Sequence, residues 1–367
     1  MHTLFVDGIR NDRPSGGRTC TDLYLASIGD ECIYYKQALS IGRKVPLVVL
    51  MNLPGAVFSL VNSKYPTIAL EFFTRFSFGV FFRVVLAAFK TRARVVYLNH
   101  HSVYYFLPFF KLFKCKVIVI AHDSLTVKSR LGCNNFLSGK ITSTLERYFL
   151  SNADEIFTFS YDDYSFYLEC GFNVTKILPV VERPVLERSL VKSSNFRFGL
   201  IGNWYRRENK DGAVAFFQEF IERWRLVGDD NIKFVLAGVG SETFFRDYLL
   251  PIDPDKVSAC VELFGSYRSI DDLRLSGVVA PILSGGGIKL KTLESLTVGL
   301  PVFGTEQAYT GLPPECRLGN PFMARDIGEL VSLIGVHSQS DSFNRAFCSK
   351  DILSAYWRFI DSNRDFG

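Results

Sequence analysis

The residues of this sequence best suited to chemistry lie together between positions 281 and 305. Three successive glycines at 285–287 are followed by Lys289, Lys291 and Glu294. Glycine lets the backbone approach a ligand closely, and lysine supplies a point charge for an anion. Glu294 follows Lys291 by three residues, so on a helix the two side chains share a face and could hold a phosphate and a sugar hydroxyl side by side. The segment predicts a diphosphate site beside a hydroxyl-bearing group.

The elements around these residues would place them at the end of a sheet. Val278–Leu283 is apolar and predicts a buried strand, Ile288–Val298 has helical spacing, and Gly299 is a typical helix stop. A helix that starts directly after a strand and a glycine turn presents unpaired N–H groups and a positive dipole end to an anion. Lysines in that first turn are unfavourable unless an anion sits there. The alternative is a plain connecting turn with both lysines in solvent.

The run that begins at residue 287 resembles the nucleotide-sugar-binding segment of family-4 glycosyltransferases with the GT-B fold. The shared residues are Gly287, Ile288, Lys289, Lys291, Leu293, Glu294, Ser295 and Leu296, then Gly299, Pro301, Val302 and Thr305. The resemblance implies that Glu294 binds the ribose of the donor nucleotide. It also implies that the turn, with Gly286, Gly287, Ile288 and Lys291, binds the diphosphate. The family often has a second acidic residue where this chain has Gly286, so no carboxylate role is expected there.

A second donor segment, FGLIGNWYRRENKDG, leads from a predicted strand at Phe196–Ile201 through Gly202 into a polar loop, with a helix expected from about Gly212. Ligands bind such sheets at the carboxyl ends of the strands. The family has an arginine where this chain has Asn203. The cations available instead are Arg206, Arg207 and Lys210. We expect Gly202, Arg206 and Lys210 to contact the donor, the alternative being solvated charges in a polar loop.

In the first half, the strand Lys116–Ala121 ends in His122 and Asp123, a polar pair at the carboxyl edge of a sheet. Family-4 enzymes have a similar strand ending in a histidine that touches the transferred sugar, so the resemblance implies this role for His122. We take His122 and Asp123 as the catalytic candidates; a histidine that only caps the strand is the alternative. His100-His101 is interpreted as a polar strand end, since no third ligand with metal spacing accompanies it.

Two glycine-rich turns remain. Gly16 and Gly17 follow the first strand, and the resemblance implies an acceptor-binding loop there, although ordinary turn chemistry explains them equally well. Gly238 and Gly240 follow another strand, but Thr243 stands where a dinucleotide fingerprint needs its third glycine. This argues against a dehydrogenase and predicts a tight turn from strand to helix.

Strand-like and helix-like segments alternate along both halves of the chain, which predicts an α/β protein with two parallel sheets covered by helices. The resemblance implies the GT-B arrangement of two Rossmann-like domains with an interdomain cleft. The expected parts are a basic, acceptor-binding domain at 1–180, a Pro- and Ser-containing linker at 181–195, a nucleotide-sugar-binding domain at 196–350, and a C-terminal helix at 351–367 that could cross back to the first domain.

Composition narrows the class of protein. A chain of 367 residues with 48% hydrophobic residues can bury two cores. Its eight cysteines show no Cys-x-x-Cys pair, so neither a zinc site nor a disulfide framework is predicted, and a reduced cytosolic compartment fits. The N-terminus starts with a strand-like run and not a signal peptide. The most apolar stretch, Phe76–Phe89, contains Arg83 and is shorter than the roughly 20 residues of a spanning helix.

Charge is uneven along the chain, with a net charge of +7 over residues 1–190 and −2 over the remainder. Between positions 40 and 120, eleven basic residues accompany one acid, Glu71. Phenylalanines are interleaved with them: Phe72, Phe73, Phe76, Phe78, Phe81, Phe82, Phe89, Phe106, Phe109, Phe110 and Phe113. Rings beside cations predict a surface that lies on anionic lipid headgroups. An ordinary core with a solvated rim is the alternative, and no nucleic-acid-binding motif is present.

Together these features predict a glycosyltransferase that moves a hexose-type sugar from a UDP- or GDP-type nucleotide sugar to a lipid-linked or growing glycan acceptor. Cell-surface polysaccharide or glycoconjugate synthesis at the inner face of the membrane is the expected setting. The resemblance implies retention of anomeric configuration and no metal or further cofactor. The alternative is a catalytically inactive GT-B scaffold or glycan-binding protein, which the departures at Asn203 and Gly286 favour. A nucleotide-sugar epimerase would need an acidic constellation that the sequence lacks.

Overall fold

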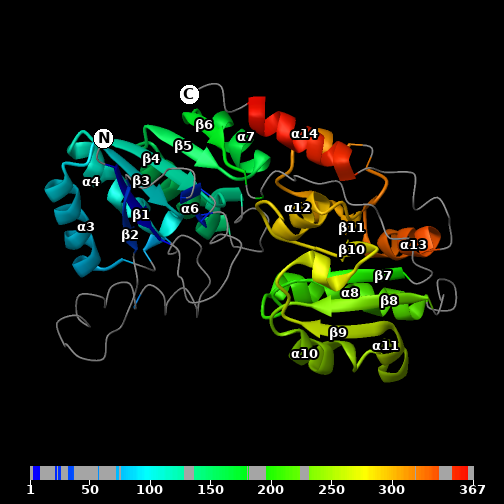
Figure 1. The fold of residues 1–367 in the computed structure, drawn as a ribbon. Helices are drawn as coiled ribbons and strands as arrows, with labels where there is room; N and C mark the ends of the chain where they lie inside the picture. The colour runs from blue at the N-terminus through cyan, green and yellow to red at the C-terminus, as the bar shows by residue number, and fades with distance from the viewer. Residues whose placement is uncertain are drawn as a thin grey trace. The chain divides into compact units, whose positions relative to one another are not determined.

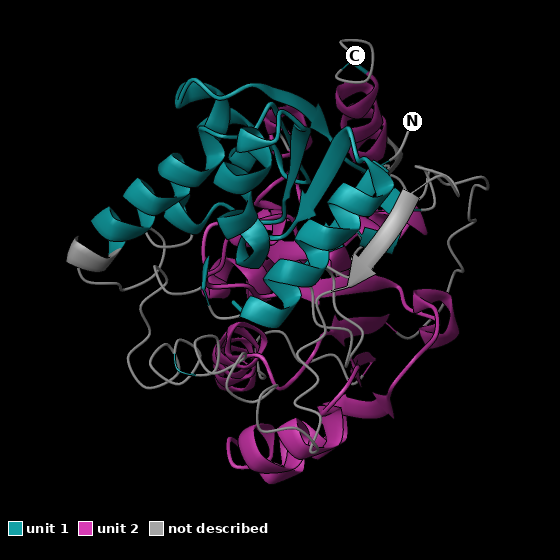
Figure 2. Ribbon diagram, turned by 90° about the vertical axis from the view of Figure 1, so that its left-hand side faces the viewer, with its two compact units in different colours: residues 1–180, 362–367 teal, residues 181–361 magenta. Residues whose placement is uncertain are grey.

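The computed structural model describes residues 3–8, 21–22, 24–25, 32–36, 57, 72–73, 76–127, 136–179, 181, 196–223, 231–318, 320–338 and 349–362. The chain divides into two compact units, coloured separately in Figure 2. The first comprises Met1–Val180 with Ser362–Gly367, and the second comprises Val181–Asp361. Apart from Val181, the predicted linker at 181–195 lies outside the described residues, as do the glycines at 16 and 17.

The described part of the first unit is built on a parallel sheet with the strand order β2-β1-β3-β4-β5-β6 (Figure 1). Its strands are β1 (Thr3–Asp7), β2 (Cys32–Lys36), β3 (Val95–Asn99), β4 (Lys116–Ala121), β5 (Glu155–Thr158) and β6 (Val174–Ile177). The helices are α3 (Phe78–Thr91), α4 (Leu107–Leu112), α6 (Phe136–Leu150) and α7 (Tyr161–Glu169), with a 3₁₀ turn at His101–Phe106. The strands are apolar because helices cover a parallel sheet on both faces.

Helix α3 has clear local reasons for its ends. Ser77 caps its start with a side-chain oxygen that accepts from the Val80 N–H at 3.4 Å. At the other end, Arg92 adopts a left-handed conformation and its N–H returns to the carbonyls of Ala88 and Phe89. The helix lies beside α4 (Figure 1), and the Phe81 ring stacks on Phe106 with centroids 5.3 Å apart. One face of α3 is therefore fixed to the core.

The second unit also contains a parallel sheet, with the order β12-β11-β10-β7-β8-β9 among the described strands. These are β7 (Phe196–Ile201), β8 (Ile232–Ala237), β9 (Val261–Gly265), β10 (Gly277–Ala280), β11 (Val302–Thr305) and β12 (Met323–Ala324). The helices are α8 (Arg207–Glu222), α10 (Ser241–Phe244), α11 (Pro254–Cys260), α12 (Leu290–Thr297), α13 (Ile327–Ser338) and α14 (Ser349–Ser362). Both units are thus Rossmann-like, as the alternating sequence pattern predicted.

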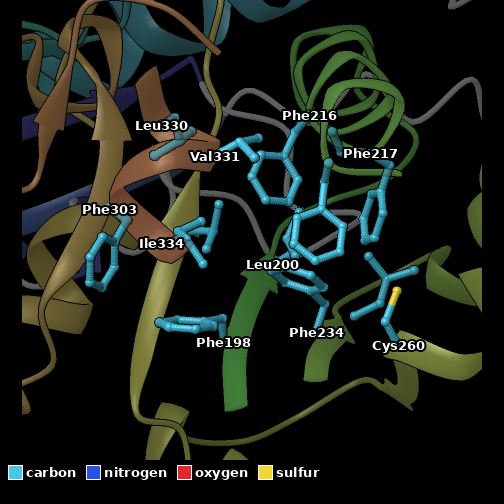
Figure 3. Packing of buried hydrophobic residues seen from close by; sticks show 14 of the residues in the cluster. Phe198, Leu200, Phe216, Phe217, Phe234, Cys260, Phe303, Leu330, Val331 and Ile334 are labelled. Carbon is cyan, nitrogen blue, oxygen red and sulfur yellow. The ribbon is translucent and has the colours of Figure 1, made fainter. Parts of the chain in front are cut away.

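The core of the second unit is rich in aromatic rings (Figure 3). Phe234 on β8 packs edge-on against Phe216, Phe217 and Phe220 of α8, with centroids 4.8 to 5.4 Å apart. Helix α13 contributes Leu330, Val331 and Ile334 to the same cluster. The cluster fixes α8 against the sheet, and with it the loop that enters α8 from β7.

The start of α8 corrects one prediction. The helix begins at Arg207 and not near Gly212, so Lys210 lies on its first turns and not in a loop. Gly212 is buried within α8, and a Cβ there would lie 1.7 Å from the carbonyl oxygen of Pro281. This glycine permits a close approach between backbones and does not mark a helix boundary. Strand β10 likewise ends at Ala280, earlier than the predicted Leu283.

No helix among the described residues is both long enough and apolar enough to span a bilayer.

Candidate functional site

The candidate donor site lies where the strand order of the second sheet reverses. Strands β7 and β10 are parallel neighbours, yet the chain runs from β7 outward through β8 and β9, and from β10 in the opposite direction through β11 and β12. Ligands bind open α/β sheets at such a switch point, outside the carboxyl ends of the strands. Helix α8 follows β7 and α12 follows β10, so both helix N-termini lie at this edge.

Direct contacts join the two segments. The Nζ of Lys291, in the first turn of α12, donates to the Oδ1 of Asn209 in the first turn of α8 at 3.0 Å. The Nδ2 of Asn209 donates in turn to the Asn203 carbonyl at 2.9 Å. Together with the close approach of Gly212 to Pro281, these bonds hold the two N-termini together. The two segments that carry the predicted donor residues therefore lie in contact within the second unit.

The glycine turn is shaped by its own lysine. Gly285 and Gly287 have φ values of +115° and +68°, which favour glycine. Lys289 precedes the first residue of α12, and its Nζ donates to the carbonyls of Gly285 and Gly286 at 3.0 and 2.7 Å. The structure thus separates two lysines that the sequence treated alike. Lys289 braces the turn, and Lys291 is the lysine that reaches the neighbouring helix.

A half-buried pair of opposite charges is the main electrostatic feature of the site. Burial, with a smaller contribution from Lys289, lowers the pKa of Lys291 to about 8. Burial also raises the pKa of Glu294. Neither side chain forms a salt bridge with any residue that the structure describes, and they do not pair with each other. Glu294 also raises the pKa of Tyr267, after the larger effect of burial, to about 12, which places this tyrosine near the carboxylate.

The predicted cations of the β7–α8 segment take different positions. Arg206 is the exposed N-cap residue of α8, and its side chain forms no cap hydrogen bond. Arg207 pairs with Asp211 along the helix, Nε to Oδ2 at 3.0 Å. Lys210 turns to Tyr248, with its Nζ 4.7 Å from the ring centroid and 3.3 Å from the hydroxyl. Within the described part of the chain, Arg206 is therefore the member of this group that neither pairs with a carboxylate nor packs on a ring.

The loop after β7 is held rigidly against the loop after β8. Trp204 is buried, and its Nε1 donates to the Ala237 carbonyl at 2.9 Å. Gly238 has a φ of +116°, and a Cβ there would lie 2.0 Å from the carbonyl oxygen of Gly202. Gly240 precedes the first residue of α10 with a φ of +82°. Gly238 and Gly240 therefore form the tight strand-to-helix turn that the sequence predicted. Gly238 also lies in close backbone contact with Gly202.

Sequence reasoning missed three residues that shape this site: Asn209, Tyr267 and Thr292. Thr292 donates from Oγ1 to the Ala308 carbonyl at 2.7 Å. Thr305, the last residue of the run at 287–305, similarly donates to the Ile282 carbonyl and fixes the chain just after β10. Asn209 carried no clear signal, because the lysine that it contacts lies 82 residues away in the sequence. Tyr267 carried none, because its proximity to Glu294 arises only in the folded sheet.

In the first unit, His122 belongs to a hydrogen-bond network at the corresponding switch point, between β1 and β3. Asn99, the last residue of β3, is its centre and is fully buried. The Asn99 Nδ2 donates to Asp7 Oδ1 and to Thr21 Oγ1, both at 2.9 Å. The Asn99 Oδ1 lies 2.8 Å from His122 Nε2. Sequence reasoning missed Asn99 and Asp7, although both end strands at the same sheet edge.

This network fixes the tautomer of His122. Both Nδ2 hydrogens of Asn99 are in use, so its Oδ1 must accept, and the Nε2 of His122 must carry the hydrogen. Burial, with a smaller contribution from His101, lowers the pKa of His122 to about 3, so the ring is neutral. Its Nδ1 is then an acceptor, and it accepts no hydrogen bond from a described residue. Such a nitrogen suits a hydroxyl donor.

His100 is more than a polar strand end. Its Nδ1 accepts from the Ser102 N–H at 3.3 Å and so caps the 3₁₀ turn, with its own φ at +81°. The Ser102 hydroxyl continues to the Gly8 carbonyl at 3.1 Å. The His100 ring also lies 5.9 Å from that of His122, centroid to centroid. The turn after β3 thus reaches the same site as the end of β4.

Asp123 lies next to a buried pair of carboxylates that hold the loop after β4. Glu146 accepts from the Ser124 hydroxyl and from the N–H groups of Leu125 and Thr126, at 2.9 to 3.1 Å. Asp163 accepts from the Ser124 N–H at 3.0 Å. Burial, and then the nearby Asp123, raises the pKa of Asp163 to about 7. These carboxylates position the loop that carries Asp123.

Among the described residues, no group of three or more His, Cys, Asp or Glu side chains is arranged to hold a metal ion. The predicted acceptor residues Gly16 and Gly17 lie outside the described residues.

No protein-family model matches the chain, and no curated protein matches its sequence. Solved structures do match its fold. OtsA, a trehalose-6-phosphate synthase, aligns over 100% of both chains with a TM-score of 0.68 and 9% identity. Sucrose-phosphate synthase from Thermosynechococcus elongatus aligns over 98% of this chain and 96% of its own, with a TM-score of 0.63 and 13% identity. A related structure from E. coli, bound with UDP-2-fluoro glucose, covers 100% of this chain and 96% of its own, with a TM-score of 0.58 and 11% identity.

These proteins are GT-B glycosyltransferases, and the likeness establishes that this chain has the GT-B fold. The fold predicted from the run at 287–305 is therefore confirmed.

Proposed function

We propose that this protein is a glycosyltransferase that takes its sugar from a nucleotide-diphosphate donor. One observation carries the proposal. Lys291 and Glu294 are half-buried charges on one face of α12, next to the N-terminus of α8, and no described residue pairs with either by a salt bridge. Burying a charge is unfavourable unless a partner compensates it. A diphosphate at Lys291 and a ribose hydroxyl at Glu294 supply both partners.

The chemistry follows from the position of these groups. Transfer breaks the bond between the anomeric carbon of the sugar and the terminal phosphate oxygen, and forms a bond from that carbon to an acceptor hydroxyl oxygen, whose proton is released. Negative charge develops on the leaving diphosphate. Lys291, Arg206 and the N-termini of α8 and α12 would stabilise that charge. Such fixed donors perform the task that a divalent ion performs elsewhere, so we propose a metal-independent reaction without a further cofactor. By family resemblance, the anomeric configuration is retained.

In the first unit, we assign the transferred sugar to His122. Its neutral ring is held by Asn99, and its Nδ1 acceptor would take a hydrogen bond from a sugar hydroxyl. Asp123 follows directly on the same loop, which Glu146 and Asp163 hold in place. Neither residue is assigned as a nucleophile.

The acceptor is proposed to be a lipid-linked or growing glycan, as in cell-surface polysaccharide or glycoconjugate synthesis at the inner face of a membrane. Support comes from the exposed aromatic and cationic surface of the first unit, and from the free cysteines among the described residues, which suit a reducing compartment.

Nucleotide binding gives the test. UDP or GDP should raise the melting temperature of the full-length protein, because a ligand that binds only the folded state stabilises it. Lys291→Ala and Glu294→Ala should abolish the shift. Lys256→Ala is the matched control, since it removes a partly exposed lysine on α11 of the same unit, which pairs with Asp253, and should leave the shift unchanged. Release of nucleotide from a panel of UDP-, GDP- and CMP-sugars then identifies the donor.

The outcomes separate the two candidate functions. Binding with donor turnover supports the transferase. Binding without turnover of any donor would assign the chain to the inactive scaffold or glycan-binding class. No nucleotide binding at all would overturn the donor site.

A further inference from the structure

Helix α3 exposes large apolar side chains along one face. Phe78, Phe82, Leu86 and Phe89 are 47%, 54%, 55% and 55% exposed. Their spacing of four, four and three residues places them on one stripe of the helix. Side chains of this size are usually buried, and a contiguous exposed apolar stripe marks an interaction surface.

The stripe continues onto the end of α4. Leu112 is 79% exposed and Phe113 is 45% exposed. The rings of Phe89 and Phe113 meet edge-on with centroids 4.8 Å apart, so the two helix ends form one surface. We call these six residues the α3–α4 face. The opposite side of α3 is well packed, since Val84 is fully buried and Phe81 stacks on Phe106. The exposure is therefore a property of the folded unit.

The charged residues of the sequence segment that carries this face are all basic. Between residues 76 and 122 the sequence has seven Lys or Arg and no Asp or Glu. Lys111 pairs with Asp154, and Lys116 pairs with Glu155. The other basic residues form no salt bridge within the described part of the chain: Arg83, Lys90, Arg92, Arg94 and Lys114. A partner for this surface must offer an apolar region for the exposed rings and negative charge for the cations.

Two of these cations occupy positions that usually select glycine. Arg92 ends α3 with a φ of +49°, and Lys114 follows α4 with a φ of +55°. A left-handed residue at a helix end is commonly glycine, because a side chain is strained there. Both strained positions carry a positive charge next to the ends of the α3–α4 face. Arg92 and Lys114 therefore lie beside the face at two backbone positions where glycine would be less strained.

We infer that the α3–α4 face binds the surface of an anionic phospholipid bilayer. The rings of the face enter the boundary between headgroups and acyl chains, and the rim of Lys and Arg contacts lipid phosphates. A helix lying in the interface, with phenylalanine and leucine on one face and cations beside it, is the form that such binding takes. The proposed function enters this inference at one point: membrane binding would bring the first unit to a lipid-linked acceptor.

Liposome flotation tests the binding. The full-length protein should float with phosphatidylcholine vesicles that contain phosphatidylglycerol, and at least tenfold less with phosphatidylcholine alone. High salt should reduce the binding, because the charge term is screened. Absence of binding to the anionic vesicles would overturn the inference.

Variants locate the binding. Phe82→Ser with Phe89→Ser should lower the partition coefficient at least tenfold, and so should Lys90→Glu with Lys114→Glu. Leu318→Ser is the matched control, since Leu318 is an exposed leucine of the second unit, and binding should stay within twofold. Equal binding by all variants would place the contact elsewhere and refute the α3–α4 face.

The depth to which the α3–α4 face enters the bilayer can be measured independently, by fluorescence quenching. Phe82→Trp places an indole on the face, and brominated lipids should quench its fluorescence beyond the quenching of the wild-type protein, whose tryptophans all lie in the second half of the chain. No added quenching contradicts insertion.

Two further measurements distinguish membrane binding from self-association and from loss of the donor site. Sedimentation that shows a dimer dissociated by Phe82→Ser with Phe89→Ser, without vesicle binding, would instead assign the face to a second copy of the chain. The nucleotide-induced thermal shift is measured in the same variants without lipid. It should be unchanged, so that failure of membrane binding and failure of the donor site are seen separately.

Discussion

The Nε2 atom of His122 lies 2.8 Å from the Oδ1 of Asn99, and this single contact defines what the histidine can do. Asn99 donates both amide hydrogens, to Asp7 and Thr21, so it offers only an acceptor to the ring. The contact exists because β3 and β4 pair with Asn99 opposite Ile120, two residues before the histidine. Strand register thus determines the chemistry of a side chain at the sheet edge.

The first prediction concerns the tautomer of His122. Long-range proton–nitrogen NMR should show Nε2 protonated and Nδ1 unprotonated from neutral pH down to about pH 4, because the pKa of the ring is about 3. Asn99→Ala should destabilise the protein by about 1–3 kcal/mol, since buried groups lose their partner. A resonance pattern with Nδ1 protonated would contradict the assignment.

The second prediction concerns the pH dependence of nucleotide binding. In the free protein the pKa of Lys291 is about 8, below its usual 10.5, and a bound diphosphate favours the charged form and raises it again. The affinity for UDP should therefore fall as pH rises above 8, by at most about tenfold per pH unit. Isothermal titration between about pH 6.5 and 9.5 spans this pKa and measures the fall. Lys291→Arg keeps its charge and should flatten the profile; the same slope in this variant would implicate another group.

The third prediction concerns Gly212. Alanine within a helix normally stabilises by about 1 kcal/mol relative to glycine. Here its Cβ would lie 1.7 Å from the Pro281 carbonyl oxygen, so Gly212→Ala should instead destabilise by about 1–3 kcal/mol or more, seen in urea unfolding. It should also weaken UDP binding, because it separates α8 from the glycine turn. Gln218→Ala, at an exposed position of the same helix, is the control and should change little.

The fourth prediction concerns Asp163. Burial, and then Asp123, raises its pKa in the folded state to about 7, while Glu146 adds a smaller effect. The folded protein holds a proton that the unfolded chain releases, so this group's contribution to stability is complete below about pH 4 and is lost as pH rises towards 7. Asp163→Asn should remove that contribution. The difference in unfolding free energy between wild type and variant should change by up to about 1.4 kcal/mol per pH unit. A difference that is constant between about pH 4 and 7 would show that Asp163 is ionised in the fold.

Much of the donor half could be predicted from the sequence because its signals are local. Strand, glycines and helix follow one another within 281–305, and the spacing of Lys291 and Glu294 places them on one helix face. The roles of Lys289 and Gly212 were not predictable in the same way. Both depend on backbone groups that lie close only after folding, the carbonyls of the turn for Lys289 and that of Pro281 for Gly212.

The first unit shows a second reason for limited prediction. Helix α3 has apolar residues on more than one side, so the periodicity of its sequence groups residues into faces but does not show which face packs against the core. On α3 the structure buries Val84 and stacks Phe81 on Phe106, and it leaves Phe78, Phe82 and Phe89 exposed. The sequence had grouped all of these rings together. Asn99 was missed for a related reason, since its partners are distant in the chain.

The hydrogen bonds from Lys289 to the carbonyls of Gly285 and Gly286 reduce the entropy that the turn would lose when a ligand binds. A loop of three glycines loses much conformational entropy when it becomes ordered. If it became ordered only on ligand binding, that cost would weaken the affinity. Here an ammonium group from the same chain already holds the loop. The proposed donor would therefore meet a turn that is already ordered, and little of its binding energy would be spent on ordering that turn.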